Sequence, residues 1–173
     1  SLGTIKKEMA DELGISNDAE FIVGGADTQI ALKSVGMGVG DVAVVSGTTS
    51  PVATITDYKY YDKQERCWTD SNLGGDTYQV ETNPGVTGLN YQKMKAFLFP
   101  DTSYEELEEE MAKQTEYLCT ASFSSLYFSE KRSLKKGGFV MKAPFDATMK
   151  PIHLIWAVVA DIACSIYVQY RSL

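Results

Sequence analysis

Hydrophobic and polar residues alternate along this chain in two patterns, and together they predict a mixed α/β protein. Apolar residues spaced as in helices predict helical segments at 2–15, 27–36, 84–99, 103–114 and 149–173. Shorter apolar runs bounded by turn residues predict strands at 20–25, 41–47, 50–57, 64–72, 76–83, 125–132 and 137–143. The run at 20–25 is expected to be a buried strand, and residues 41–83 to form a β-meander.

Composition is typical of a globular domain and disfavours a nucleic-acid-binding surface. The 173 residues are 44% hydrophobic and carry a formal net charge of −7. The basic cluster at 131–136 is expected to be a solvated loop. The apolar run at 152–163 is expected to be too short to span a bilayer, so no membrane association is predicted. The abrupt start and the end inside a predicted helix suggest a piece of a larger protein.

Cysteine and histidine are too few for several common kinds of site. Cys67, Cys119 and Cys164 are odd in number and far apart, which argues against a disulfide framework and fits a reducing cytoplasm. His153 is the single histidine, so neither a zinc site nor a Ser-His-Asp hydrolase is expected. His153 itself is expected to be a structural residue at a helix end, and no metal ligand is assigned.

Asp27 stands at the junction between the predicted strand at 20–25 and the helix that follows. Pockets form at the carboxyl ends of strands in α/β proteins, where a carboxylate can act as a base on a substrate hydroxyl. The alternative is a helix N-cap, because aspartate accepts the free N–H groups there. Position alone favours the cap.

Residues 47–50, Gly-Thr-Thr-Ser, join the next two predicted strands. Backbone N–H groups and hydroxyls in such a turn can bind phosphate oxygens, although an ordinary hairpin turn has the same composition. The segment 81–92 then leads into a helix through Gly85 and Gly88. Those glycines would let an anion approach a helix N-terminus, and close helix–strand packing would explain them equally well.

In this order the segments 23–50, 80–95 and 137–163 resemble the C-terminal half of the FGGY carbohydrate kinases, above all xylulokinases and autoinducer-2 kinases. The resemblance implies an α/β fold of the ribonuclease-H-like, actin-like ATPase type, as one truncated domain over residues 1–173. It would lack the N-terminal kinase domain and the late adenine-binding glycine loop. Lys142 and Ala160 depart from the family pattern in the last segment.

The resemblance also implies roles for individual residues. Asp27 would be the base that accepts the proton of the sugar hydroxyl during transfer from ATP, with Mg²⁺ as companion ion. Further contacts are implied with ATP at Gly47, Thr48, Thr49, Gly88 and Gln92, and with the sugar at Gly25, Thr28 and Gln29. The implied partners are a sugar or polyol and the N-terminal domain; a homo-oligomer is left open, and the location is cytoplasmic.

Two kinds of function remain open on the sequence. The first is a carbohydrate kinase, of which the isolated segment is expected to be inactive. The second is a non-catalytic binding or regulatory module with an actin-like fold. Intact Asp27, Gly47 and Thr48 favour the kinase. A hydrolase lacks both the necessary histidine and a convincing pair of acids.

Overall fold

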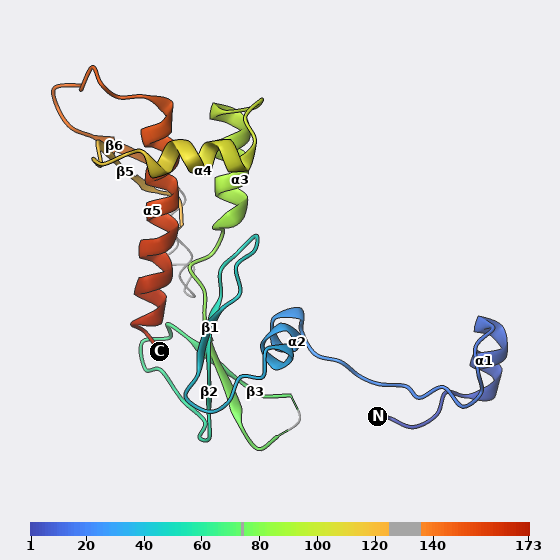
Figure 1. The fold of residues 1–173 in the computed structure, drawn as a ribbon. Helices are drawn as coiled ribbons and strands as arrows, with labels where there is room; N and C mark the ends of the chain where they lie inside the picture. The colour runs from blue at the N-terminus through green and yellow to red at the C-terminus, as the bar shows by residue number, and fades with distance from the viewer. Residues whose placement is uncertain (74, 125–135) are drawn as a thin grey trace.

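The computed structural model describes residues 1–73, 75–124 and 136–173, and it shows a sheet, a layer of helices and an extended N-terminal arm (Figure 1). The helices are α1 (Lys7–Leu13), α2 (Asp27–Ser34), α3 (Gly88–Leu98), α4 (Tyr104–Ala112) and α5 (Pro151–Tyr170). The strands are β1 (Val42–Val44), β2 (Val52–Thr56), β3 (Trp68–Ser71), β4 (Tyr78–Thr82), β5 (Cys119–Ser122) and β6 (Gly138–Met141). The strand predicted at 125–132 and most of the basic cluster at 131–136 lie outside the described residues.

The main sheet is antiparallel, with the strand order β1-β2-β4-β3. Each of the four strands was predicted, but the meander was wrong, because β2 pairs with β4 rather than with β3. Four of the five β4 residues are buried, and such a buried strand is best placed between two neighbours. The half-exposed β3 takes the edge, and the long connection at 57–67 allows this order.

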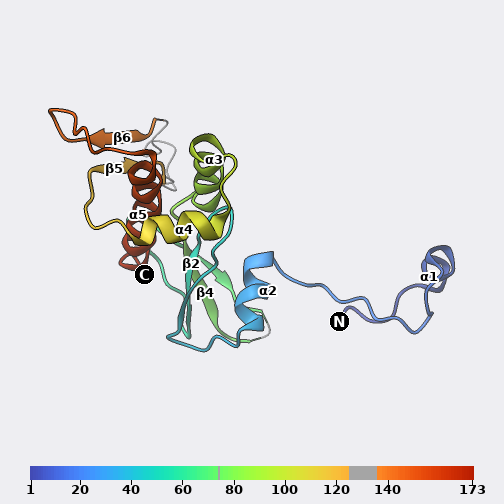
Figure 2. The ribbon, with the colours of Figure 1, turned by 45° about the horizontal axis from the view of Figure 1, so that its top comes forward.

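Three helices form a second layer beside one end of the sheet. Leu107 of α4 packs with Ile152 and Ile155 of α5 in a core that α3 completes. The hairpin of β5 and β6 lies along the N-terminal half of α5 (Figure 2). Strand β5 was not predicted, because the short run Cys-Thr-Ala-Ser has no distinctive apolar pattern.

Polar contacts hold both ends of helix α5. Pro151 occupies its first turn, as predicted, and His153 Nδ1 accepts a hydrogen bond from the Lys150 N–H at 2.9 Å. The prediction of a structural histidine at a helix end is therefore confirmed. At the other end, Gln169 lies against the buried Thr82 hydroxyl, which donates to the Arg66 carbonyl at 2.8 Å. These contacts fasten the end of α5 to β4.

The apolar run in α5 belongs to a longer helix than the sequence suggested. With 20 residues and a mean hydropathy of 1.7, α5 is the one helix in the described part of the chain that could cross a membrane by length and composition. The prediction that the run is too short therefore does not hold for the whole helix. Ile152, Ile155, Ala157 and Val158 are nevertheless buried in the protein, so length and composition alone do not assign a membrane location.

The arm formed by residues 1–26 leaves the rest of the molecule, with α1 at its far end (Figures 1 and 2). Backbone hydrogen bonds between Leu2 and Phe21 and between Gly3 and Phe21 close it on itself. The prediction of a buried strand at 20–25 is wrong: Phe21, Ile22 and Val23 are 56%, 69% and 63% exposed. In the described part of the chain no sheet lies beside this run, and an apolar run is buried only against a partner surface.

The connection at 57–67 is held by a local ion pair. Asp62, with 4% of its side chain exposed, accepts hydrogen bonds from Arg66 Nε and Nη2 at 2.8 and 3.0 Å. It also accepts from the backbone N–H groups of Arg66 and Gln64. The hydrogen bonds with Arg66 hold the pKa of the Asp62 carboxyl well below its usual range.

Replacing Asp62 with asparagine is expected to raise hydrogen exchange of the amides at 62–67 about tenfold, because charge-assisted hydrogen bonds are lost. Since the folded pKa is lowered, the wild-type protection holds above the unfolded pKa of about 3.9 and is lost as pH falls below it. Exchange measured by mass spectrometry on the full-length protein, with the exposed Asp57→Asn as control, checks this. Equal exchange in both variants would contradict it.

Candidate active site

Asp27 is the first residue of α2, and its side chain is exposed. The N-cap is Ala26, so the N-cap interpretation of Asp27 is not what the structure shows. Among the described residues, Asp27 Oδ1 accepts only the N–H of the neighbouring Thr28, at 2.8 Å. Gln29 instead braces the helix start, because its Oε1 accepts the Ala26 N–H at 3.3 Å. The carboxylate of Asp27 therefore keeps acceptor capacity for a ligand.

The turn at 47–49 is the tip of the hairpin formed by β1 and β2. The Gly47 N–H donates to the Thr49 carbonyl at 2.9 Å and closes the turn, with Thr48 at its apex. Within the described residues, neither the Thr48 N–H nor the Thr49 N–H donates a hydrogen bond. A Cβ added at Gly47 would meet only the Thr49 carbonyl oxygen, at an ordinary 3.8 Å. The fold itself therefore leaves open space beside the Gly47 backbone.

One pocket of about 290 Å³ contains both features that the sequence singled out. It is lined by Asp27, Thr28 and Ala31 from α2 and by residues of the β1–β2 hairpin: Val45, Gly47, Thr48, Thr49 and Pro51. A carboxylate thus faces the same space as a turn with two unengaged amides. Free backbone N–H groups attract anions, and a carboxylate in reach of them can take up a proton from a bound hydroxyl.

Four predicted site residues do not line this pocket. Gln92 is exposed on α3, and Gln29 is engaged at the start of α2. Gly88 has a packing reason for being glycine because its neighbours are backbone atoms, whereas the neighbours of Gly25 are the ends of flexible side chains. A Cβ at Gly25 would lie 2.8 Å from the Leu73 side chain, and one at Gly88 would lie 2.2 Å from the Gly47 carbonyl oxygen. Close packing, one of the two readings left open for Gly88, is what the structure shows.

Glu81 is a buried acid on the same side of the sheet, which the sequence did not single out as a site residue. It lies opposite Ala53 on β2, and alternation along the hairpin places it on the face that carries Val45 and Pro51. Its side chain accepts from Gln79 Nε2 at 2.9 Å. Burial raises the pKa of Glu81, and the charges of Asp70 and Asp27 raise it further.

Replacing Glu81 with glutamine is expected to leave the melting temperature at pH 7.5 unchanged or higher. A raised folded pKa means that stability present below the unfolded pKa, about 4.3, is lost as pH rises through the folded value. Glutamine removes that loss and keeps an acceptor for Gln79. Thermal unfolding of the full-length protein at pH 7.5 and pH 4 checks this, with exposed Glu105→Gln as control. A lower melting temperature at pH 7.5 would contradict it.

Comparison with known proteins connects this geometry to kinases, although no family model matches the sequence. The chain is 42% identical over 168 residues to the Bacillus subtilis (strain 168) protein named "Putative sugar kinase YoaC". The match covers 96% of this chain and 34% of that protein. In sequence the chain is therefore similar to about a third of a protein that is named as a putative sugar kinase.

Solved structures agree with this match at the level of the fold. Xylulose kinase from Rhodospirillum rubrum superposes with a TM-score of 0.80 at 18% identity, covering 99% of this chain and 35% of that one. Gluconate kinase from Lactobacillus acidophilus gives a TM-score of 0.71 at 17% identity, covering 94% and 33%. The α/β fold that was expected from the resemblance to the FGGY carbohydrate kinases is confirmed. The chain spans about a third of the length of these relatives.

Proposed function

We propose that this chain is the part of an ATP-dependent sugar kinase that holds the catalytic base and a phosphate-binding turn. The single observation that carries the proposal is the pocket shared by Asp27 and the turn at 47–49. Phosphoryl transfer requires mainly positioning and stabilisation of charge. Asp27 would position the attacking hydroxyl, and the amides of the turn would stabilise the phosphate charge. Homology to a sugar-kinase segment gives the reaction class.

In this proposal Asp27 acts on the sugar and the turn acts on the phosphates. The Asp27 carboxylate orients the attacking hydroxyl and accepts its proton as the new oxygen–phosphorus bond forms. The N–H groups of Thr48 and Thr49 donate to phosphate oxygens, while Gly47 leaves room for their approach. Thr28, on the wall of the pocket, faces the sugar side.

Magnesium-bound ATP would supply the phosphoryl group and part of the charge neutralisation. Among the described residues, no group of three histidine, cysteine or acidic side chains could hold a metal ion. The ion would therefore be bound mostly by phosphates and water, as is usual for Mg²⁺ with nucleotides. The residues present fit such an arrangement, with the turn amides on the phosphates and Asp27 as the nearby carboxylate.

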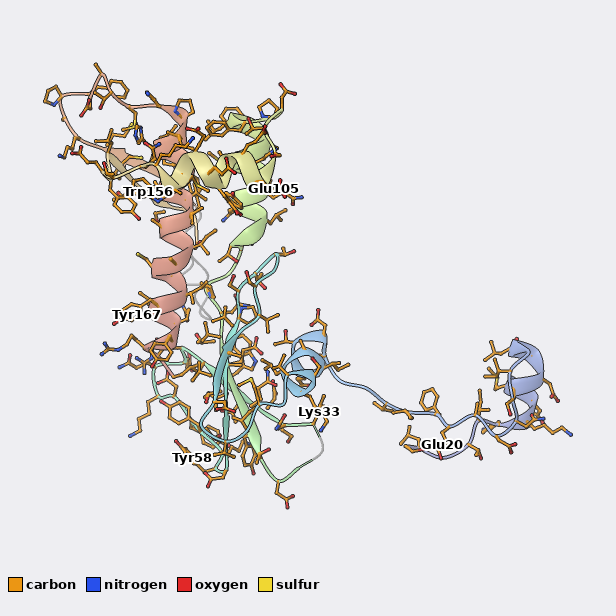
Figure 3. All side chains as sticks on the ribbon, in the orientation of Figure 1. Glu20, Lys33, Tyr58, Glu105, Trp156 and Tyr167 are labelled. Atoms are coloured by element: carbon orange, nitrogen blue, oxygen red, sulfur yellow. The ribbon has the colours of Figure 1, made fainter. Side chains whose placement is uncertain are left out.

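The remaining two thirds of such a kinase are expected to cover the exposed arm. Phe21, Ile22 and Val23 form an exposed apolar run a few residues before Asp27 (the arm appears with Glu20 labelled in Figure 3). A surface of this kind is normally buried against another part of the protein. The partner domain would also complete the sugar site, and the expected location is the cytoplasm. A ketose is the favoured substrate class, by analogy with the xylulose kinases that share the fold.

The proposal is tested by ADP release from the full-length protein with magnesium-ATP and a panel of ketoses, polyols and autoinducer analogues. Release that depends on one of these acceptors is the expected result. A matched panel without acceptor measures simple ATP hydrolysis. If no acceptor stimulates release, the non-catalytic module with an actin-like fold is the better description.

A further inference from the structure

The start of α3 is bonded to the turn at 47–49, although the two segments are about forty residues apart in the sequence. The N–H groups of Thr87 and Leu89 both donate to the Thr48 carbonyl, at 3.0 and 3.4 Å. Thr49 and Val86 form an antiparallel bridge. The hydroxyls of Ser50 and Thr87 share a hydrogen bond of 2.6 Å, and the two residues are 1% and 0% exposed.

These contacts determine which way the turn presents its amides. A trans peptide is planar, so the Thr48 carbonyl and the Thr49 N–H point in opposite directions. With the carbonyl fixed on α3, the Thr49 N–H is directed to the side of the turn away from α3. The pocket has no lining residue from the start of α3, which fits this division of the turn into a held side and an open side.

The same contacts change the role expected for the α3 N-terminus. Two of its N–H groups are already engaged with the Thr48 carbonyl, so this helix end is occupied by the protein itself. The partial positive charge of the helix end stabilises the partial negative charge of that carbonyl. The helix end thus supports the turn.

We infer that Thr87 is a positioning residue for nucleotide binding: through Ser50 and the Thr48 carbonyl it holds the turn in the conformation that exposes its amides. This inference rests on the proposed function of the turn. Thr87 touches neither reactant, because its side chain is buried on Ser50. The buried hydroxyl pair has no other partner in the described residues, so its evident consequence is the geometry of the turn.

The test measures magnesium-ATP binding to the full-length protein by isothermal titration calorimetry. Thr87→Val leaves the Ser50 hydroxyl buried without a partner. It is expected to weaken binding about tenfold, because the turn is no longer held in the conformation that exposes its amides. Thr87→Ser restores the hydroxyl and is expected to recover wild-type affinity. The matched control is Thr82→Val. It also removes a buried hydroxyl, but one that is hydrogen-bonded to the Arg66 carbonyl and to Gln169 rather than to the turn.

A purely structural role would lower the melting temperature of both valine variants and leave the affinity for ATP unchanged in both. That result would overturn the inference while leaving the proposed function intact. If the wild-type protein does not bind magnesium-ATP at all, both the inference and the proposed phosphate-binding turn are overturned. The expected pattern is loss of affinity in Thr87→Val alone, with similar thermal destabilisation in Thr87→Val and Thr82→Val.

Discussion

Replacing Asp27 with asparagine in the full-length protein is expected to lower kcat for sugar phosphorylation by about 10²–10⁴-fold, the usual contribution of a general base. Asparagine has nearly the same shape, and its carbonyl oxygen can still accept the Thr28 N–H. It cannot accept the proton of the attacking hydroxyl. The dissociation constant for magnesium-ATP is expected to change little, because the turn at 47–49 carries the phosphate contacts in this account.

The control for this variant is Asp41→Asn. Asp41 is also exposed and also accepts a backbone N–H, from Gly38 at 2.9 Å, but it does not line the pocket. Its replacement is expected to leave turnover unchanged. Initial rates at saturating ATP and sugar, measured for both variants, separate the two positions. Turnover of Asp27→Asn close to wild type would rule out Asp27 as the base.

Replacing Gly88 with alanine is expected to have the second-largest effect. The added Cβ would lie 2.2 Å from the Gly47 carbonyl oxygen, far inside contact distance. The atoms it meets all belong to the backbone of Gly47 and Thr48. The turn or the start of α3 must therefore move. Overpacking of this kind costs about 1–3 kcal/mol of folding stability. Because the displaced element is the proposed phosphate-binding turn, affinity for magnesium-ATP should fall about tenfold or more.

A matched substitution shows whether the clash is responsible. Gly138→Ala introduces the same methyl group on β6, where no atom of the described residues lies within 4 Å of the added Cβ. It is expected to leave stability and ATP binding unchanged. Thermal unfolding and calorimetric titration of both variants measure the two effects. Loss of ATP affinity in Gly88→Ala without loss of stability would contradict the packing role and indicate a direct contact between Gly88 and the nucleotide.

Asp27 and the turn at 47–49 could each be singled out from sequence because each is encoded locally, whereas the resemblance to a kinase family grouped them in one site. Asp27 follows an apolar run and begins a helix, and Gly47 and Thr48 stand between two alternating strands. In the structure, Asp27 and the turn line the same pocket. Their roles in catalysis and in phosphate binding stay proposals until the variants are measured.

The support around the turn could not be predicted in the same way. Ser50 and Thr87 are 37 positions apart, and nothing in either segment indicates that their hydroxyls meet in the interior. The burial of Glu81 depends on β4 taking a central place in the sheet, and the expected meander concealed this. The predicted burial of Phe21 to Val23 was wrong for a related reason, since burial of an apolar run depends on the surface available to cover it.

The most direct test of the central claim is to identify the product by ³¹P NMR. Full-length protein, magnesium-ATP and the best acceptor from the ADP-release panel are followed over time, with Asp27→Asn in parallel. The account predicts that a sugar-phosphate resonance grows in equal proportion to ADP in the wild-type sample and is nearly absent in the variant. Release of inorganic phosphate alone, or equal sugar phosphorylation in both samples, would contradict it.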